Sequence, residues 1–232
     1  MGRIIAIGGG FGDTDDAFTL VDHIMELSGK EHPAYLQIPT TSFDNIDTGV
    51  MSKFFNNGCT VDVLLLTHAG ITEELIAEKI RKADLIHVPG GNLNFVMTVW
   101  KNTGTDKYLK EAYDQGKILF GTSSGAMCWF REGYDDCGKN NEMMFVDCLD
   151  LQPYCFCPHY DSAFWQQFNE DIKTRSISGI GCENEAAVCF IDDKRYLLSA
   201  TRRIDARAFL FDINDGFKRK DLTDESKLLE NL

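Results

Sequence analysis

A serine flanked by glycines stands where an apolar segment gives way to a helix. The apolar segment 118–120 is followed by Gly121-Thr-Ser123-Ser-Gly125, which has the form G-x-S-x-G. Glycines on both sides of the serine permit a sharp strand-to-helix turn that lifts the central side chain above a sheet. The turn also aims the N–H of Ser124 and the positive end of the helix at a developing oxyanion. The pattern predicts that Ser123 is the nucleophile of an acyl transfer, and the competing interpretation is a purely structural turn.

A second loop rich in glycine lies about thirty residues upstream. The apolar segment Leu85–Val88 ends in Pro89-Gly90-Gly91-Asn92. A glycine backbone can approach a ligand closely and donate a second N–H to an oxyanion. Neighbouring parallel strands would place both loops at the carboxyl edge of one sheet, where open α/β sheets bind ligands.

A serine nucleophile needs a base within hydrogen-bond reach, and the base needs a group that orients it. Of the five histidines, His159 is the strongest candidate, because it follows the apolar segment Phe156-Cys157-Pro158 and precedes Tyr160-Asp161 and a helix. His23 falls in a predicted helix, and His87 falls in a predicted buried strand where a core histidine is the plainer interpretation.

The sequence offers no strong cofactor or metal motif. Asp13 stands where the third glycine of a G-x-G-x-x-G motif would follow Gly8-Gly9-Gly10-Phe11-Gly12, which favours close backbone packing over nucleotide binding. The eight cysteines include no C-x-x-C pair, and Cys155 and Cys157 have no second ligand cluster after them. We therefore expect no cofactor, no metal, and mostly reduced, buried thiols.

The composition bounds the partners and the location. The net charge of −13 argues against nucleic acids and anionic membranes, whose binding depends on Lys and Arg. The chain has neither an apolar run long enough to span a membrane nor a signal peptide, so we expect a cytoplasmic protein. The oligomeric state is not fixed by the sequence, and a homodimer is left open.

Apolar and amphipathic segments alternate through the first half of the chain. Strands are predicted at 3–7, 35–38, 61–66, 85–88 and 118–120, with helices from Asp13 to about Leu27 and at 48–57 and 72–82. After Phe130 we expect a polar loop, short strands, a helix near 162–175 and a hairpin of 186–191 with 195–200, all extending the same sheet. We expect residues 1–232 to form one α/β domain, a doubly wound, mostly parallel sheet with helices on both faces.

Three motifs together resemble a known family. The loop Pro89–Asn92, the elbow Gly121–Ala126 and the segment Cys157–Asp161 are similar, in order and spacing, to the peptidase E family of serine hydrolases. This family includes aspartyl dipeptidases and cyanophycinases. The resemblance implies a fold like that of class I glutamine amidotransferases. It also implies Ser123 as nucleophile, His159 as general base, and an oxyanion hole formed by N–H groups of Gly90 or Gly91 and of Ser124.

The resemblance leaves the acidic member of the triad open. The segment Gly181-Cys-Glu183-Asn-Glu185 matches the family's acidic segment, with Glu183 in the better register and Glu185 as the rival. A different assignment places an aspartate between serine and histidine, which falls on Asp135 or Asp136. The chemistry requires a carboxylate that accepts from the imidazole N–H.

The resemblance also implies short peptides as substrates, with N-terminal aspartyl dipeptides as one class. Such substrates need a basic group after the histidine, and Arg175 is the candidate because a guanidinium binds a carboxylate through two hydrogen bonds. The alternatives are another serine acyl hydrolase, such as an esterase, an amidase or a cyanophycinase-like enzyme, and a non-catalytic binding protein of the amidotransferase fold.

Overall fold

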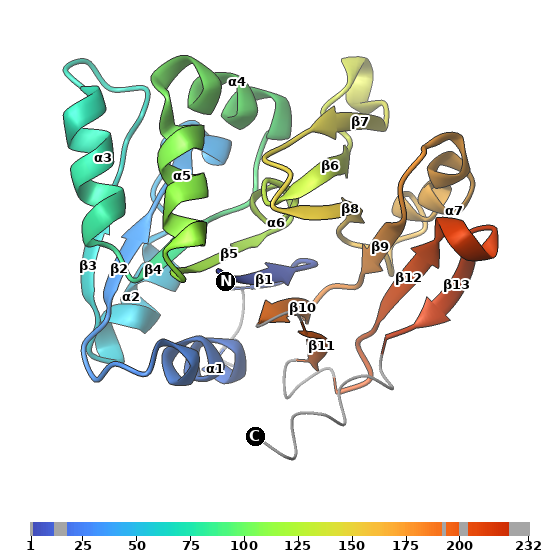
Figure 1. Cartoon of the computed structure of the whole chain (residues 1–232), viewed down its shortest axis with the longest axis horizontal. Helices are drawn as coiled ribbons and strands as arrows, with labels where there is room; N and C mark the ends of the chain where they lie inside the picture. The colour runs from blue at the N-terminus through green and yellow to red at the C-terminus, as the bar shows by residue number, and fades with distance from the viewer. Residues whose placement is uncertain (1, 12–17, 192–193, 200–203, 223–232) are drawn as a thin grey trace.

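The computed structural model of the chain describes residues 2–11, 18–191, 194–199 and 204–222. The larger of its two sheets has the strand order β11-β10-β1-β5-β4-β2-β3 (Figure 1). The strands are β1 (Arg3–Ile7), β2 (Ala34–Gln37), β3 (Thr60–Val63), β4 (Leu85–Val88), β5 (Ile118–Thr122), β10 (Ala186–Ile191) and β11 (Lys194–Ser199). The five strands from β1 to β5 are parallel, and the hairpin β10–β11 joins antiparallel to β1. The predicted α/β sheet with a hairpin extension is confirmed.

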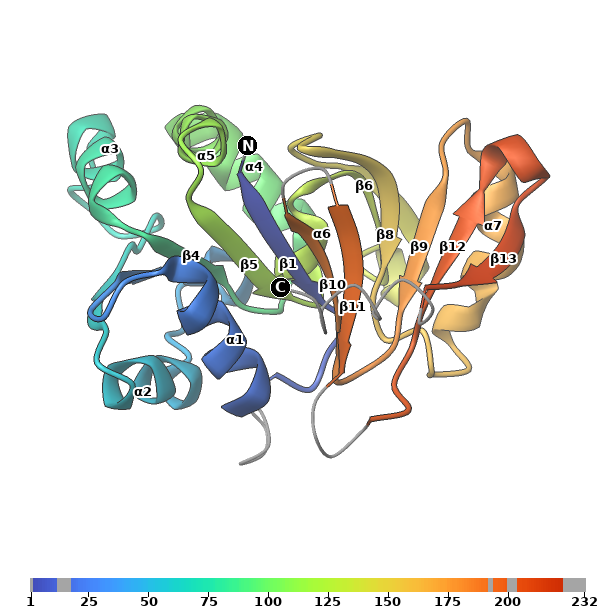
Figure 2. The ribbon, with the colours of Figure 1, turned by 60° about the horizontal axis from the view of Figure 1, so that its bottom comes forward.

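Helices cover both faces of this sheet, as the alternation predicted (Figure 2). On one face α1 (Phe18–Ser28) and α2 (Thr48–Asn56) share a buried cluster with the strand residues Ile5 and Phe120. On the other face lie α3 (Glu73–Lys82), α4 (Leu93–Thr103) and α5 (Thr105–Asp114). The predicted start of the first helix at Asp13 lies outside the described residues. Within the described residues, no helix has both the length and the apolar character needed to cross a membrane.

A second sheet departs from the expected arrangement. Its order is β13-β12-β9-β8-β6-β7, formed by β6 (Phe130–Asp135), β7 (Met144–Asp147), β8 (Gln152–Cys157), β9 (Gly179–Cys182), β12 (Ala208–Asp212) and β13 (Lys218–Asp221). We expected the strands after Phe130 to extend the first sheet, and only β10 and β11 do so. Only the short segment 123–129 separates β5 from β6, and a further parallel strand in the first sheet would need a crossover of about a dozen residues or more. The second sheet packs against the α3–α5 side, where Phe130 stacks on Phe156 in the main core.

The helix expected near 162–175 is also broken into short pieces. A 3₁₀ turn at Trp165–Gln167 leads into α7 (Phe168–Asp171) and a further 3₁₀ turn at Ile172–Thr174. The aromatic side chains of Trp165 and Phe168 pack onto the second sheet in a separate buried cluster. This cluster fixes the segment that follows His159.

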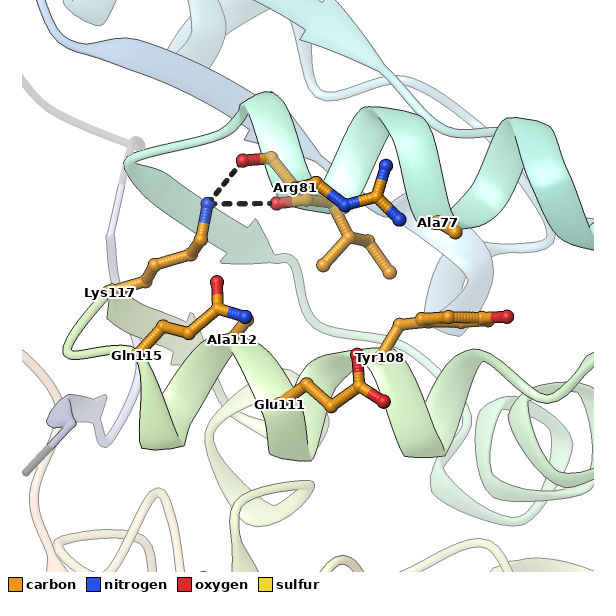
Figure 3. A pocket seen from close by; sticks show the side chains of 8 residues that line it. Ala77, Arg81, Tyr108, Glu111, Ala112, Gln115 and Lys117 are labelled. Carbon is orange, nitrogen blue, oxygen red and sulfur yellow. Dashed lines mark hydrogen bonds between the residues drawn. The ribbon is translucent and has the colours of Figure 1, made fainter.

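Lys117 directly precedes β5, at the end of the sheet opposite to the predicted site. Its ammonium donates to the carbonyl oxygens of Ile80 at 3.2 Å and Arg81 at 2.6 Å, at the carboxyl end of α3 (Figure 3). A cation at this end of a helix satisfies carbonyl groups that have no partner within the helix. Lys117 lines the shallow groove between α3 and α5 in Figure 3, and its hydrogen bonds tie the end of α3 to the start of β5.

His87 lies in β4 with almost no exposure, as the core interpretation predicted. Its Nδ1 accepts a 2.6 Å hydrogen bond from the hydroxyl of Tyr35, which in turn accepts from the amide of Gln37. The imidazole stacks on Phe120 with ring centroids 4.8 Å apart. Burial without a counter-ion lowers the pKa of His87 to about 3.

This burial predicts an acid-dependent loss of stability. The unfolded chain binds a proton at His87 below its ordinary pKa of 6.5, whereas the folded chain stays neutral there until about 3. Stability from the neutral imidazole is therefore present above pH 6.5 and falls as the pH drops toward 3. Between pH 7 and 5, the wild-type free energy of unfolding should fall by about 2 kcal/mol more than that of His87→Gln. Urea unfolding of both proteins at both pH values measures these free energies. An equal fall in the free energy of unfolding for wild type and His87→Gln would contradict the prediction.

Candidate active site

Ser123 sits on a strained turn between β5 and the short helix α6 (Ser124–Met127). Its φ of 55° and ψ of −124° are uncommon for a residue with a side chain, as at a nucleophile elbow. A Cβ at Gly121 would lie 2.4 Å from the Gly125 carbonyl oxygen, and a Cβ at Gly125 would lie 2.0 Å from that of Val88. The turn therefore requires both glycines of the motif.

His159 lies directly above the serine. It follows β8 with a φ of 50°, and its Nε2 is 2.8 Å from the Oγ of Ser123. The ring of Trp165 packs beside the imidazole, with centroids 5.2 Å apart. The structure thus brings together the predicted nucleophile and the predicted base.

Asn184 occupies the third position, where a carboxylate was expected. Its Oδ1 is 2.7 Å from the Nδ1 of His159. Its side-chain and backbone N–H groups both donate to Asp161 Oδ1, at 2.9 and 3.0 Å, which fixes the amide with its oxygen toward the imidazole. A hydrogen on Nδ1 leaves Nε2 free to accept from Ser123, so this order of bonds sets the tautomer that a base requires.

The two glutamates beside Asn184 are directed elsewhere. The carboxylate of Glu183 accepts from the backbone N–H of Arg207 at 3.0 Å. Glu185 has a φ of 64°, and its side chain lies beside Gly10. This placement corrects the expectation that Glu183 or Glu185 orients His159. The chain reverses at these residues, so the side chain between the two glutamates is the one that faces the imidazole.

Asp135 and Asp136 lie at the end of β6 and directly after it. Asp135 is buried at the end of β6, and its Oδ2 is 3.2 Å from the Oγ of Ser124. Burial, followed by the neighbouring Asp136, raises the pKa of Asp135 to about 7. Asp136 lines the cavity above Ser123. The structure places neither residue in hydrogen-bond contact with His159.

The loop Pro89–Asn92 reaches the serine as predicted. Gly91 has a φ of 151°, and a Cβ there would lie 2.1 Å from the Thr41 carbonyl oxygen. A Cβ at Gly90 would lie only 3.4 Å from that of Ser123, so this loop backs directly onto the nucleophile. Within the described part of the chain, the N–H groups of Gly91 and Ser124 meet no acceptor. They fit the role of oxyanion donors.

The glycine cluster after β1 supports the site by close packing. A Cβ at Gly9 would lie 2.0 Å from Asn184 Oδ1 and 2.5 Å from the His159 ring, and one at Gly8 would lie 2.1 Å from the Glu183 carbonyl oxygen. This arrangement agrees with the interpretation of close backbone packing in place of a phosphate loop.

A cavity of about 440 Å³ opens over these groups. It is lined by Gly91, Ser123, Ser124, Asp136, His159, Ser162, Trp165 and Asn184. None of the described residues that line it is Lys or Arg. Arg175 is not among them, because its guanidinium makes two hydrogen bonds to the buried carboxylate of Glu132 and lies over the ring of Phe145. The guanidinium that was expected to hold a substrate carboxylate is thus paired with Glu132 and is not among the residues that line the cavity.

Sequence reasoning missed Asn184 and the role of Asp161. Both residues lie within segments that had been singled out, but an amide carries no charge and gave no catalytic signal. The chain reverses at Asn184 and Glu185, between β9 and β10, so the alternation of side chains in a strand gave no signal for the residue between the two glutamates.

Comparisons with known proteins identify relatives of this chain. The model of peptidase family S51 matches residues 4–198. The uncharacterized peptidase YgaJ of Bacillus subtilis is 30% identical over 210 residues, covering 87% of this chain and 89% of that protein. The uncharacterized peptidase Lin0382 of Listeria innocua is 31% identical over 133 residues, covering 53% of this chain and 64% of that protein.

Two solved structures share the fold. A peptidase from an acI-B1 Actinobacterium superimposes with a TM-score of 0.72 at 18% identity, covering 96% of this chain and 94% of the other. A putative peptidase E protein from Listeria monocytogenes gives a TM-score of 0.66 at 21% identity, covering 87% of this chain and 100% of the other. The chain belongs to peptidase family S51, the peptidase E family.

Proposed function

We propose that this member of family S51 is a serine peptidase that hydrolyses short peptides through an acyl-enzyme on Ser123. The observation that carries the proposal is the continuous line of hydrogen bonds from Ser123 through His159 to Asn184. An imidazole held at Nδ1 can accept the serine proton at Nε2 as the hydroxyl attacks a carbonyl carbon. The N–H groups of Gly91 and Ser124 then stabilise the tetrahedral oxyanion.

The same groups complete the cycle. Protonated His159 gives its proton to the leaving amine, and the peptide bond breaks to leave an ester on Ser123. Water enters, His159 takes a proton from it, and the hydroxide attacks the ester to form a second oxyanion in the same hole. His159 then returns the proton to Oγ of Ser123 as the carboxylic acid leaves. No cofactor is needed for these steps.

The lining of the cavity argues against the expected aspartyl preference. A substrate carboxylate would meet Asp136 and none of the described cations, and like charges repel in a partly desolvated site. We therefore propose that peptides with neutral or basic N-terminal residues are cleaved faster than aspartyl peptides. A panel of dipeptides that differ only in the first residue tests the order, and an aspartyl peptide as the best substrate would contradict it.

Ser123→Ala should remove turnover and labelling by a fluorophosphonate probe. The substitution deletes the attacking oxygen at a turn that already accepts a small side chain, so kcat should fall on the order of 10³-fold or more. Intact-mass analysis and mapping of the modified peptide measure the labelling. The control is Ser52→Ala, because Ser52 is an exposed residue of α2 whose hydroxyl donates to the carbonyl of Thr48 in the same helix. Absence of labelling in the wild type would favour a non-catalytic binding protein.

Asn184→Ala should lower kcat more than Glu183→Gln or Glu185→Gln. Without the amide, Nδ1 of His159 loses its acceptor and the ring loses its orientation, which should cost roughly 10- to 100-fold in kcat. The loss should be smaller than in triads with a charged third member, because Asn184 is neutral. Glu183→Gln should stay close to wild type, since a glutamine oxygen can still accept from the N–H of Arg207. A severe loss in either glutamine variant, with little loss in Asn184→Ala, would reverse the assignment.

A further inference from the structure

The hydroxyl of Ser124 is shared between two acceptors in the wall of the site. Its Oγ lies 2.7 Å from the carbonyl oxygen of Gly91 and 3.2 Å from Oδ2 of Asp135. Ser124 is 2% exposed and Asp135 is 1% exposed, so solvent cannot readily supply a further donor. A serine hydroxyl has one hydrogen and can donate it to only one of the two oxygens. Which oxygen receives this hydrogen bond therefore depends on the charge of Asp135.

Each charge state of Asp135 favours a different arrangement. An ionised carboxylate is the stronger acceptor and would draw the hydrogen away from Gly91, since charge-assisted hydrogen bonds are about twice as strong as neutral ones. A protonated carboxyl competes weakly, or itself donates to Ser124, and leaves the hydrogen on the Gly91 carbonyl. The shorter distance to Gly91 matches the protonated arrangement.

The surroundings of Asp135 favour the protonated form. The titratable groups that face it are all acidic: the carboxyl of Asp136 beside it and the thiols of Cys128, Cys137, Cys148 and Cys157 from neighbouring elements. Among the described residues, none of these facing groups is a cation. Burial and the adjacent carboxyl raise the pKa of Asp135 to about 7.

The carbonyl of Gly91 belongs to the loop that carries a proposed oxyanion donor. On the far side of the same peptide unit, the N–H of Asn92 donates to the carbonyl of Thr41 at 2.7 Å. The peptide is thus held at both ends, by Thr41 and by Ser124. If the bond from Ser124 is lost, this peptide can rotate. The rotation moves the Cα of Gly91, which joins it to the preceding peptide and its Gly91 N–H.

We propose that Asp135 is a positioning residue: in its protonated form it leaves the hydroxyl hydrogen of Ser124 on the Gly91 carbonyl and so holds the oxyanion loop in its working geometry. The catalytic part of this inference rests on the proposed serine hydrolase function. The part that concerns the hydrogen bonds does not.

Nuclear magnetic resonance can test the hydrogen bonds without any substrate. The ¹³C signal of the Asp135 carboxyl, assigned by its absence in Asp135→Asn, should titrate near pH 7. The amide ¹⁵N signal of Asn92, which senses the Gly91 carbonyl, should shift over the same pH range in the wild type. That shift should be absent in Asp135→Asn and in Ser124→Ala. Titration of Asp135 near its ordinary pH of about 4, or an Asn92 shift that persists in both variants, would overturn the proposal.

Kinetics then test the consequence for the reaction. The wild-type rate should fall about tenfold on the alkaline side, between pH 6 and 9, because a misaligned oxyanion donor costs less than the 10²- to 10³-fold of a deleted one. The asparagine in Asp135→Asn cannot ionise, so this variant should not show the fall in kcat between pH 6 and pH 9. Ser124→Ala should have a kcat about tenfold below wild type, with little change in KM and no fall in kcat between pH 6 and pH 9. Adding Asp135→Asn to Ser124→Ala should change kcat no further, because both substitutions act on the same hydrogen bond.

Asp147→Asn is the matched control, because Asp147 is an exposed carboxylate on β7 of the same sheet and should keep the wild-type ratio. An alkaline decline that survives in Asp135→Asn or Ser124→Ala would overturn the proposal. If the wild type neither turns over acyl substrates nor reacts with the probe, the proposed function fails, and the titrations of Asp135 and Asn92 still decide the hydrogen-bond arrangement.

Discussion

Three consecutive carbonyl groups at the end of β1 hold the site together. The carbonyl oxygens of Ile7, Gly8 and Gly9 accept from the backbone N–H groups of Ser123, His159 and Glu185 at 3.0, 3.0 and 2.9 Å. Each donor belongs to a different segment of the chain, and each segment carries one side chain of the hydrogen-bonded line. Because adjacent carbonyls of one short strand have a fixed spacing, the distances between nucleophile, base and orienting group follow from the backbone of β1 and its extension.

This anchoring explains why the cluster after β1 consists of glycines. A side chain at Gly9 would occupy the space of the imidazole and of the Asn184 amide, and a side chain at Gly8 would meet the backbone of Cys182 and Glu183, just before Asn184. The same contacts hold the strained backbone at Ser123 and His159. Each of these residues has a positive φ, and its N–H donates to the carbonyl of Ile7 or Gly8. Strain of this kind persists only where the surrounding structure over-determines it.

The sequence predicted the elements whose signals are local. Alternation of apolar segments with amphipathic helices identified β1 to β5 and α2 and α3 within a few residues. The second sheet was not predictable in this way, because its core pairing joins β6 to β8 and β8 to β9 in parallel, across long connections. Nor could the sequence tell that α7 would be a single turn, since Trp165 and Phe168 pack by tertiary contacts that override a helical pattern.

The residues of the candidate site also differ in whether a local sequence pattern or a tertiary contact determines their position. Ser123, His159 and Gly91 were predictable because glycine-rich turns at strand ends impose their positions through the backbone. Asn184 was not, because its role depends on a chain reversal at Glu185 and on the carboxylate of Asp161. Asp161 is exposed, so solvent screens much of its charge, and it reaches the imidazole only through the amide. In the proposed mechanism the third position therefore acts chiefly by fixing the tautomer and the angle of His159, and an amide whose own orientation is fixed is sufficient for that task.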